Sequence, residues 1–303
     1  MSWVFLTDHY AYKLKKPVRF PFLDFSTMER RKHFCEEEVR LNRRLAPEVY
    51  IGTVPMTFGL DQALALGGDG PAIDWLVKMR RLSAERMLDY AIRHDTLLAD
   101  DIDRLAARLA AFYRTAKSLR ITASDYRRRF ESDIAENQHE LRAYANGVPS
   151  PQVDRIHVAQ LAFMTKEAEL FERRVSDGRI IEAHGDLRPE HIALGADPQI
   201  IDCLEFNPEF RTLDPADELS FFMIECEMLG APAVGATVFN RYRAATGDQP
   251  PPMLLDFYKA FRASLRAKIT IWHLGETPVR DPARWPPLAR RYLDVAEMYA
   301  SRL

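Results

Sequence analysis

The chain has 303 residues, and 42 Lys and Arg against 44 Asp and Glu give a formal net charge of −2, which predicts attraction neither to nucleic acid nor to membranes. A hydrophobic content of 47% suits a folded protein of one large domain or two lobes, and three isolated cysteines favour a reducing compartment over disulfides or a zinc knuckle. The apolar run at residues 3–6 is too short for a signal peptide and no run approaches the roughly 20 apolar residues of a membrane span, so we expect a cytoplasmic protein.

The first eighty residues alternate like a small sheet that carries one helix. The predicted strands are residues 3–6, 10–16, 49–58 and 73–79, with turns at 7–9 and 66–71. Asp24 or Ser26 can cap a helix that runs to about Leu45. This region is therefore predicted to be a sheet-rich lobe.

After Leu82 the pattern becomes helical, apart from two short apolar strands near residues 180–181 and 200–201. The predicted helices are a segment from Asp100 or Asp101 onward whose apolar positions extend to Leu119, then residues 153–175, 213–228 and 253–274, and a last helix after Pro287. Asp217 is expected to cap the helix at 213–228. We therefore predict an α+β chain with a sheet-rich lobe at residues 1–82 and a larger helical lobe at residues 83–303.

Two aspartates, Asp186 and Asp202, lie sixteen residues apart in different local settings. Asp186 ends a His184-Gly185-Asp186 motif in a short loop, whereas Asp202 closes an apolar strand and is followed by Glu205. Phosphoryl transfer needs one carboxylate that receives the proton of the nucleophile and a second that holds the metal bridging the nucleotide phosphates. H-G-D alone is weak, because an isolated aspartate usually caps a helix or stabilises a turn. Followed by I-D-x-x-E and by D-x-x-D at 214–217, it indicates a phosphotransferase.

Such a site also needs a strand lysine that holds the phosphates. Ala11-Tyr12-Lys13 fits the A-x-K pattern of that strand, so Lys13 is the candidate. Lys15 is the alternative, because side chains alternate along a strand and both lysines share one face. A solvated basic end of the strand would explain both lysines equally well.

A helix glutamate must position that lysine. One stripe of the predicted helix is apolar and contains Phe34, Leu41 and Leu45. Glu38 falls inside this stripe, whereas Glu37 lies on its flank. A carboxylate in an apolar stripe needs a cation, and Lys13 is the natural partner. An exposed acidic cluster on a tilted helix is the other interpretation.

A glycine-rich loop normally covers the phosphates ahead of the lysine strand, but this chain has no glycine before Gly52. Residues 1–9 provide for one strand ahead of Lys13. We therefore expect either that the first strand and the glycine loop are missing from this chain or that the phosphates are held in another way.

The combined motifs resemble the aminoglycoside phosphotransferase family, which has a bilobal protein-kinase-like fold, and in particular its poorly characterised bacterial branch, sometimes fused to an ATP-binding kinase domain. The segments at 34–47 (F-C-E-E-E-V-R-L-N-R-R-L-A-P) and 257–262 (F-Y-K-A-F-R) are similar to that branch as well. The resemblance implies ATP or GTP as donor and Mg²⁺ as metal. It makes Asp186, with His184 in the same motif, the candidate catalytic residue and Asp202 the principal metal ligand.

One position departs from the family pattern. Its Asn, five residues after the catalytic Asp, is His191 here. A neutral imidazole is a poorer ligand for Mg²⁺ than for Mn²⁺ or Zn²⁺. His191 is therefore a candidate second metal ligand that favours Mn²⁺, and a structural histidine is the alternative.

The acceptor is not readable from the sequence. Eight acidic residues between 202 and 227 would suit a cationic acceptor, and a basic stripe at 259, 262 and 266 would suit an anionic one or form a solvated helix face. We predict an ATP-dependent kinase acting on a hydroxyl of a small molecule. A degenerate kinase-like module that binds nucleotide or a partner protein without turnover is the alternative, and transfer of a nucleotidyl group is a third possibility.

Overall fold

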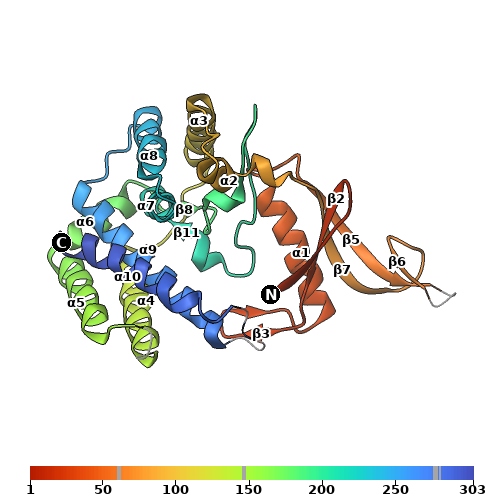
Figure 1. Cartoon of the computed structure of the whole chain (residues 1–303), viewed down its shortest axis with the longest axis horizontal. Coiled ribbons are helices and arrows are strands. Elements are labelled where there is room, and N and C mark those ends of the chain that lie inside the picture. Colours follow the sequence, from red (N-terminus) through yellow and green to blue (C-terminus); the bar gives the residue numbers. More distant parts are fainter. Residues whose placement is uncertain (60–62, 145–147, 276–278, 280) are drawn as a thin grey trace. The chain divides into compact units, whose positions relative to one another are not determined.

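The computed structural model describes residues 1–59, 63–144, 148–275, 279 and 281–303 (Figure 1). The chain divides into two compact units. The first unit contains Met1–Thr115 and His184–Thr212, and the second contains Ala116–Ala183 and Leu213–Leu303. This division cuts the chain at other places than the predicted lobes 1–82 and 83–303, because residues 83–115 and 184–212 group with the sheet.

The first unit contains a five-stranded antiparallel sheet with the strand order β1-β2-β7-β5-β6, of which Figure 1 labels β2, β5, β6 and β7. Its strands are β1 (Ser2–Leu6), β2 (Tyr10–Lys15), β5 (Tyr50–Phe58), β6 (Leu64–Leu66) and β7 (Ala72–Arg80). The four predicted strands and the turn at 7–9 are confirmed, and β6 was not predicted. Lys13 lies opposite Val4 on β1 and Val77 on β7, so it sits on an interior strand. One strand precedes β2 in the described chain, and the turn between them has no glycine.

Helix α1 (Met28–Asn42) packs against β5 and β7. Its N-cap is Thr27 rather than the predicted Asp24 or Ser26, and the Thr27 side chain accepts a hydrogen bond from the Arg30 amide at 3.3 Å. Asp24 is used elsewhere, since its carboxylate accepts from the Ser26 amide at 3.0 Å in the turn that follows the β3–β4 hairpin. The hairpin consists of β3 (Arg19–Phe20) and β4 (Leu23–Asp24). A core of Cys35, Val39, Ala46, Val49, Tyr50, Val77 and Met79 joins α1 to the sheet.

The rest of the first unit carries the loops with the two aspartates. Its elements are a 3₁₀ turn at Ala84–Arg86, α2 (Leu88–Arg93), α3 (Ala99–Thr115), a 3₁₀ turn at Pro189–His191, β9 (Ile192–Ala193), β10 (Gln199–Ile200) and a 3₁₀ turn at Pro208–Arg211. Strands β9 and β10 form an antiparallel pair that brings the segment after Asp186 back to Asp202. Leu119 lies beyond α3, so its inclusion in that helical pattern was wrong.

The second unit is mainly helical. It contains α4 (Ala123–Ala143), α5 (Ser150–Lys166), α6 (Ala168–Ser176), the short strand β8 (Ile181–Glu182), α7 (Pro215–Met228), α8 (Pro232–Thr246), α9 (Pro252–Trp272) and α10 (Trp285–Ala300). The division between the units falls within β11 (Thr212–Leu213). The helix predicted at 153–175 is two helices that meet at Glu167, and α4 and α8 were not predicted individually. Aromatic side chains of α4, α5, α6 and α9 form one of its cores.

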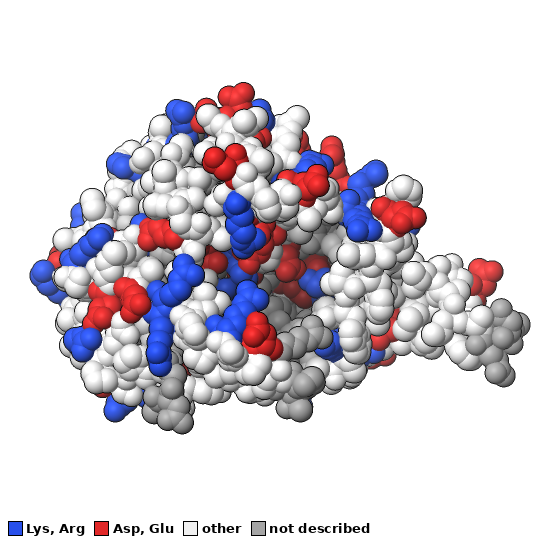
Figure 2. All heavy atoms as spheres, in the orientation of Figure 1, with Lys and Arg blue, Asp and Glu red and all other residues white. Residues whose placement is uncertain are grey.

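On the face seen in Figure 2, basic and acidic side chains are interspersed, and neither charge covers a broad area. This pattern agrees with the near-neutral net charge of −2. Within the described residues, no helix is long and apolar enough to cross a membrane.

Candidate functional site

The loop with Asp186 is held by the imidazole of His184, which is 1% exposed. Its Nε2 donates to the Ile201 carbonyl at 2.9 Å, and its Nδ1 accepts from the Asp186 amide at 3.3 Å. Gly185 has φ +89°, and a Cβ there would lie 3.0 Å from the Phe210 carbonyl oxygen, so both the backbone conformation and the close approach require glycine. The ring of His184 therefore ties the Asp186 loop to the strand end before Asp202.

The side chain of Asp202 extends from a backbone with φ +63°, the left-handed region that few residues other than glycine adopt. Two buried polar side chains hold this conformation from the first unit. The Asp202 amide donates to the Tyr50 hydroxyl at 3.1 Å, and the next amide, of Cys203, donates to the Asn42 side chain at 2.9 Å. Sequence reasoning missed both supports. Asn42 lies four residues after Glu38 on the same face of α1, which is the one signal that could have found it.

Lys13, Glu38 and Asp202 come together in the structure. The Lys13 ammonium lies 2.9 Å from Glu38 Oε1 and 2.7 Å from Asp202 Oδ1. Burial alone would lower the pKa of Lys13, but the two carboxylates outweigh it and raise that pKa well above its ordinary value. The ammonium of Lys13, ahead of burial, holds the pKa of Asp202 well below its usual range. All three groups are therefore charged at neutral pH.

Exposure separates the alternatives that the sequence left open. Lys13 is 17% exposed and the Asp202 side chain beside it is 45% exposed, whereas the Lys15 and Glu38 side chains are 0% exposed. Glu37 lies outward and pairs with Arg40 at 2.8 Å. Of the two lysines, Lys13 is the one that a ligand can reach, and Lys15 lies beneath it.

His191 lies between the two aspartates. Its Nδ1 donates to the Asp186 carbonyl at 2.9 Å and lies 3.6 Å from the Asp186 carboxylate, while its Nε2 lies 3.7 Å from Asp202 Oδ2. Because the carbonyl can only accept, Nδ1 carries a proton and a neutral ring directs the lone pair of Nε2 toward Asp202. Two acceptors that face each other need a donor or a cation between them, such as a proton, a water molecule that donates to both, or a metal ion.

A divalent cation fits this pair of acceptors. The described residues contain no group of three His, Cys, Asp or Glu side chains that could hold a metal by themselves. Mg²⁺ and Mn²⁺ in nucleotide sites commonly use one or two protein ligands and take the rest from phosphates and water. Asp202 Oδ2 with His191 Nε2 suits that arrangement, and the nitrogen ligand favours Mn²⁺.

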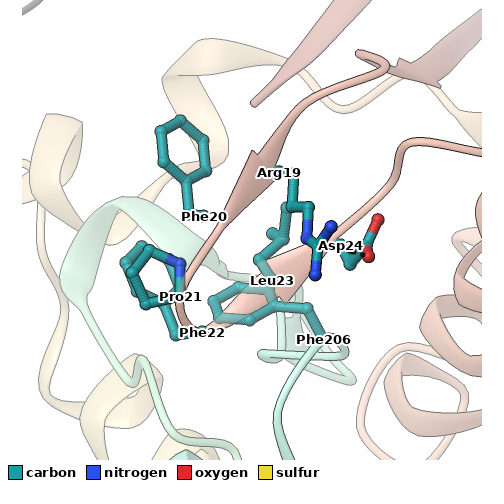
Figure 3. Close-up of a pocket in the computed structure, with 7 residues that line it drawn as sticks. All are labelled: Arg19, Phe20, Pro21, Phe22, Leu23, Asp24 and Phe206. Atoms are coloured by element: carbon teal, nitrogen blue, oxygen red, sulfur yellow. Dashed lines mark ion pairs between the residues drawn. The ribbon is translucent and has the colours of Figure 1, made fainter.

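A pocket of about 500 Å³ lies beside this region, between the β3–β4 hairpin and the segment after Glu205 (Figure 3). Its lining consists of Arg19, Phe20, Pro21, Phe22, Leu23, Asp24 and Phe206. The Phe22 ring lies 6.0 Å from the Phe206 ring. Neither Asp186 nor Asp202 lines this pocket, so we do not assign phosphoryl transfer to it.

The three basic residues expected to suit an anionic acceptor pair with three of the eight acidic residues expected to suit a cationic one. Three basic side chains of α9 pair with three acidic side chains of α7 inside the second unit. The pairs are Lys259–Glu227 at 3.0 Å, Arg262–Asp217 at 2.5 Å and Arg266–Glu225 at 3.2 Å. The basic stripe is thus neither a solvated face nor an anion site, and these acidic side chains are already neutralised.

Asp217 does not cap α7, contrary to the prediction. The N-cap is Asp214, whose carboxylate accepts from the Ala216 amide at 2.8 Å. The Asp217 carboxylate instead accepts hydrogen bonds from Nε and Nη2 of Arg262. The helix begins three residues earlier than the interpretation of Asp217 as a cap requires, because Pro215 occupies its first turn.

We expect His184 to make the fold sensitive to acid. Burial, and next the neighbouring His191, lower the pKa of His184 from 6.5 to about 4. The unfolded chain therefore takes up a proton between these values while the folded chain does not, so the stabilisation is complete above about pH 6.5 and is lost as the pH falls toward 4. A difference of this size corresponds to about 3 kcal/mol. Urea unfolding of the wild type and of His184→Gln at pH 7 and pH 4.5 measures it, and an equal pH dependence in both proteins would contradict the assignment.

No family model matches the chain. It is 33% identical over 273 residues to uncharacterised proteins of Mycobacterium bovis and of two Mycobacterium tuberculosis strains, which covers 88% of this chain and 52% of each relative. The chain thus spans about half the length of the curated relatives it matches. A solved choline kinase from Cryptosporidium parvum is similar over 97% of this chain and 82% of its own, with a TM-score of 0.53 and 10% sequence identity. The fold is protein-kinase-like. The α+β class, with a sheet-rich first part and a helical second part, is confirmed.

Proposed function

We propose that the chain is a small-molecule kinase of the aminoglycoside phosphotransferase type, which transfers a phosphoryl group from ATP or GTP to a hydroxyl. The observation that carries the proposal is the chain of neighbours Glu38, Lys13, Asp202, His191 and Asp186 within the first unit. This is the set that a phosphoryl-transfer site of the kinase fold uses. The kinase-like fold supports the proposal, and the order of the motifs along the chain relates it to that family.

The role of each side chain follows from its exposure and charge. Lys13, fixed by Glu38 on one side, presents its ammonium to the donor phosphates. Asp202 and His191 would hold Mg²⁺ or Mn²⁺, and such an ion, when bound, neutralises charge on the phosphates. Asp186, whose side chain is 23% exposed, orients the acceptor hydroxyl and takes its proton. His184 positions Asp186 through its amide and takes no part in proton transfer, because both ring nitrogens bond to the backbone.

The first experiment is a thermal-shift titration with ATP, GTP and ADP, each with Mg²⁺, Mn²⁺ or no metal. A nucleotide that binds only the folded chain raises its stability by about 2.7 kcal/mol at a hundredfold excess over Kd. A metal-dependent shift that is larger with Mn²⁺ than with Mg²⁺ is the expected result. The absence of a shift with every pair would overturn the proposal and favour a module that binds a partner protein.

Asp186→Ala is expected to lower phosphoryl transfer by about 10²–10⁴-fold, because a positioned general base contributes that much. Nucleotide binding and folding should persist, since Lys13, Asp202 and His184 remain in place. A screen of hydroxylated acceptors with labelled ATP measures transfer, and the thermal shift measures binding in the same preparations. Transfer that survives this change would show that Asp186 is not the base.

A further inference from the structure

The Lys13–Glu38 pair is part of a longer row of charges inside the first unit. The Glu38 carboxylate is shared, with Oε1 at 2.9 Å from Lys13 and Oε2 at 2.6 Å from Lys15. The Lys15 ammonium also contacts Glu205 Oε1. The order of the row is therefore Asp202, Lys13, Glu38, Lys15 and Glu205, in which two ammonium groups alternate with three carboxylates.

Both ends of this row lie on one short loop. Lys13 and Lys15 are two residues apart on one face of β2, and Asp202 and Glu205 are three residues apart in the loop after β10. Residues two positions apart on a strand are separated by roughly 6–7 Å. The loop is therefore attached to β2 at two separate points, Asp202 at Lys13 and Glu205 at Lys15. The row thus closes into a ring that joins β2, α1 and this loop.

Lys15 cannot contact a ligand from its position. Its side chain is 0% exposed, and its ammonium lies 4.9 Å from the centre of the Phe25 ring. The Glu205 side chain is 8% exposed. Lys15 and Glu205 can therefore influence the proposed reaction only through the residues that they hold in place.

The loop needs such support. Asp202 is held at φ +63°, a conformation that persists in non-glycine residues only when the surroundings fix it. Tyr50 and Asn42 fix the backbone at Asp202 and Cys203. Glu205, anchored by Lys15, fixes the loop on the other side, so the conformation is determined from both ends.

We propose that Lys15 and Glu205 are positioning residues that hold the Asp202 loop against β2, so that Asp202 keeps one oxygen on Lys13 and directs the other toward His191. The expected effect on metal-dependent nucleotide binding rests on the proposed function. The single lysine–glutamate pair that the kinase fold requires is doubled here, and the second pair serves the metal aspartate rather than the phosphates.

The test compares ATP affinity with and without Mn²⁺, measured by calorimetry, for the wild type, Lys13→Met and Lys15→Met. We expect Lys13→Met to weaken ATP binding about tenfold with or without metal, because its ammonium faces the phosphates. Lys15→Met should leave the metal-free affinity within about twofold and lower the enhancement by Mn²⁺ about tenfold. Loss of a positive charge by itself would not lower that enhancement, so the fall reports a displaced Asp202. Equal losses with and without metal would overturn the proposal.

Glu205→Gln provides a second variant that keeps the size of the side chain and an acceptor for Lys15. Although its charge change is opposite to that of Lys15→Met, positioning predicts the same direction, a smaller enhancement by Mn²⁺. Lys268→Met is the matched control. Lys268 is a buried lysine of the second unit that pairs with Glu136 at 2.8 Å, and its loss should leave the enhancement unchanged. Opposite effects of Lys15→Met and Glu205→Gln would reveal through-space electrostatics and overturn the positioning role.

Amide hydrogen exchange separates failure of this inference from failure of the proposed function, because it needs no nucleotide. The Asp202 and Cys203 amides are expected to exchange at least tenfold faster in Lys15→Met and in Glu205→Gln than in the wild type or Lys268→Met. If the wild type binds no nucleotide, the proposed function fails while this result still supports the positioning role. Unchanged exchange in both variants would overturn the positioning role even if ATP binds.

Discussion

Asp202→Asn is expected to abolish metal-dependent nucleotide binding while the protein stays folded. The carboxylate gives one oxygen to Lys13 at 2.7 Å and places the other 3.7 Å from His191 Nε2, so it is the negative group to which a divalent cation can bind. An amide of the same size keeps the backbone contacts to Tyr50 and loses the charge. Glu38 remains as a partner for Lys13, so no buried cation is left alone. In a thermal-shift titration with ATP and Mn²⁺, the wild-type shift should disappear in the variant.

Asp100→Asn supplies the control for this change. Asp100 is exposed in the first turn of α3, in the same compact unit, and its loss should alter stability by less than about 1 kcal/mol and leave the nucleotide shift intact. ATP without metal should bind Asp202→Asn at least as well as the wild type, because a negative charge near the phosphates is gone. A full Mn²⁺-dependent shift in Asp202→Asn would show that the metal binds elsewhere.

The sequence was sufficient to predict those site residues that are related to one another by local spacing along a strand, helix or loop. Strand alternation placed Lys13 and Lys15 on one face, and helix periodicity placed Glu38 in the apolar stripe, where the structure finds it fully buried. The order of H-G-D and I-D-x-x-E identified the two aspartates that flank His191. These inferences depend on period and order, which the chain carries without knowledge of its tertiary contacts.

The solvent exposure of each side chain could not be predicted from the sequence in the same way. The alternation of β2 does not indicate that Lys13 is partly exposed and Lys15 is enclosed, because that difference comes from tertiary contacts of Lys15 with Phe25 and with Glu205, the latter 190 residues away in sequence. Periodicity gives a face, and tertiary packing gives the distance of each residue from solvent. The sequence therefore left two lysines as alternatives where the structure uses both.

The acidic and basic residues of α7 and α9 provide a second example of a property that depends on tertiary packing. Each stripe was visible in the sequence, but the register between α7 and α9 that pairs Arg262 with Asp217 is a tertiary property. Separate stripes suggested two opposite acceptors. The three pairs between α7 and α9 lie within the second unit and neutralise each other, so these six side chains carry no information about substrate charge.

Arg174→Met is expected to be among the most destabilising single changes in the second unit. The guanidinium binds Asp214 through two hydrogen bonds of 2.6 Å and Asp248 through bonds of 2.5 and 2.7 Å. The three side chains are at most 7% exposed, so the variant would take the hydrogen-bonded cation away from two buried carboxylates, of which Asp248 keeps the more distant Arg179 at 3.8 Å. Removal of one partner from a buried ion pair costs about 3–5 kcal/mol, a large part of the stability of a typical domain.

Urea unfolding at pH 7 measures this loss, with Arg155→Met as the matched control. Arg155 pairs with Glu297 at 2.6 Å, but its side chain is 62% exposed, and an exposed pair of this kind contributes about 1 kcal/mol or less. The sign of the pH dependence provides an independent check. Burial acts to raise the pKa of Asp248 and Arg174 acts to lower it, so that this pKa rises when Arg174 is removed. Protonation of Asp248 then removes uncompensated charge, and the deficit of the variant shrinks as the pH falls from 7 toward 5. A deficit that equals that of Arg155→Met, or one that grows with acid, would show that the buried arginine does not stabilise the second unit in this way.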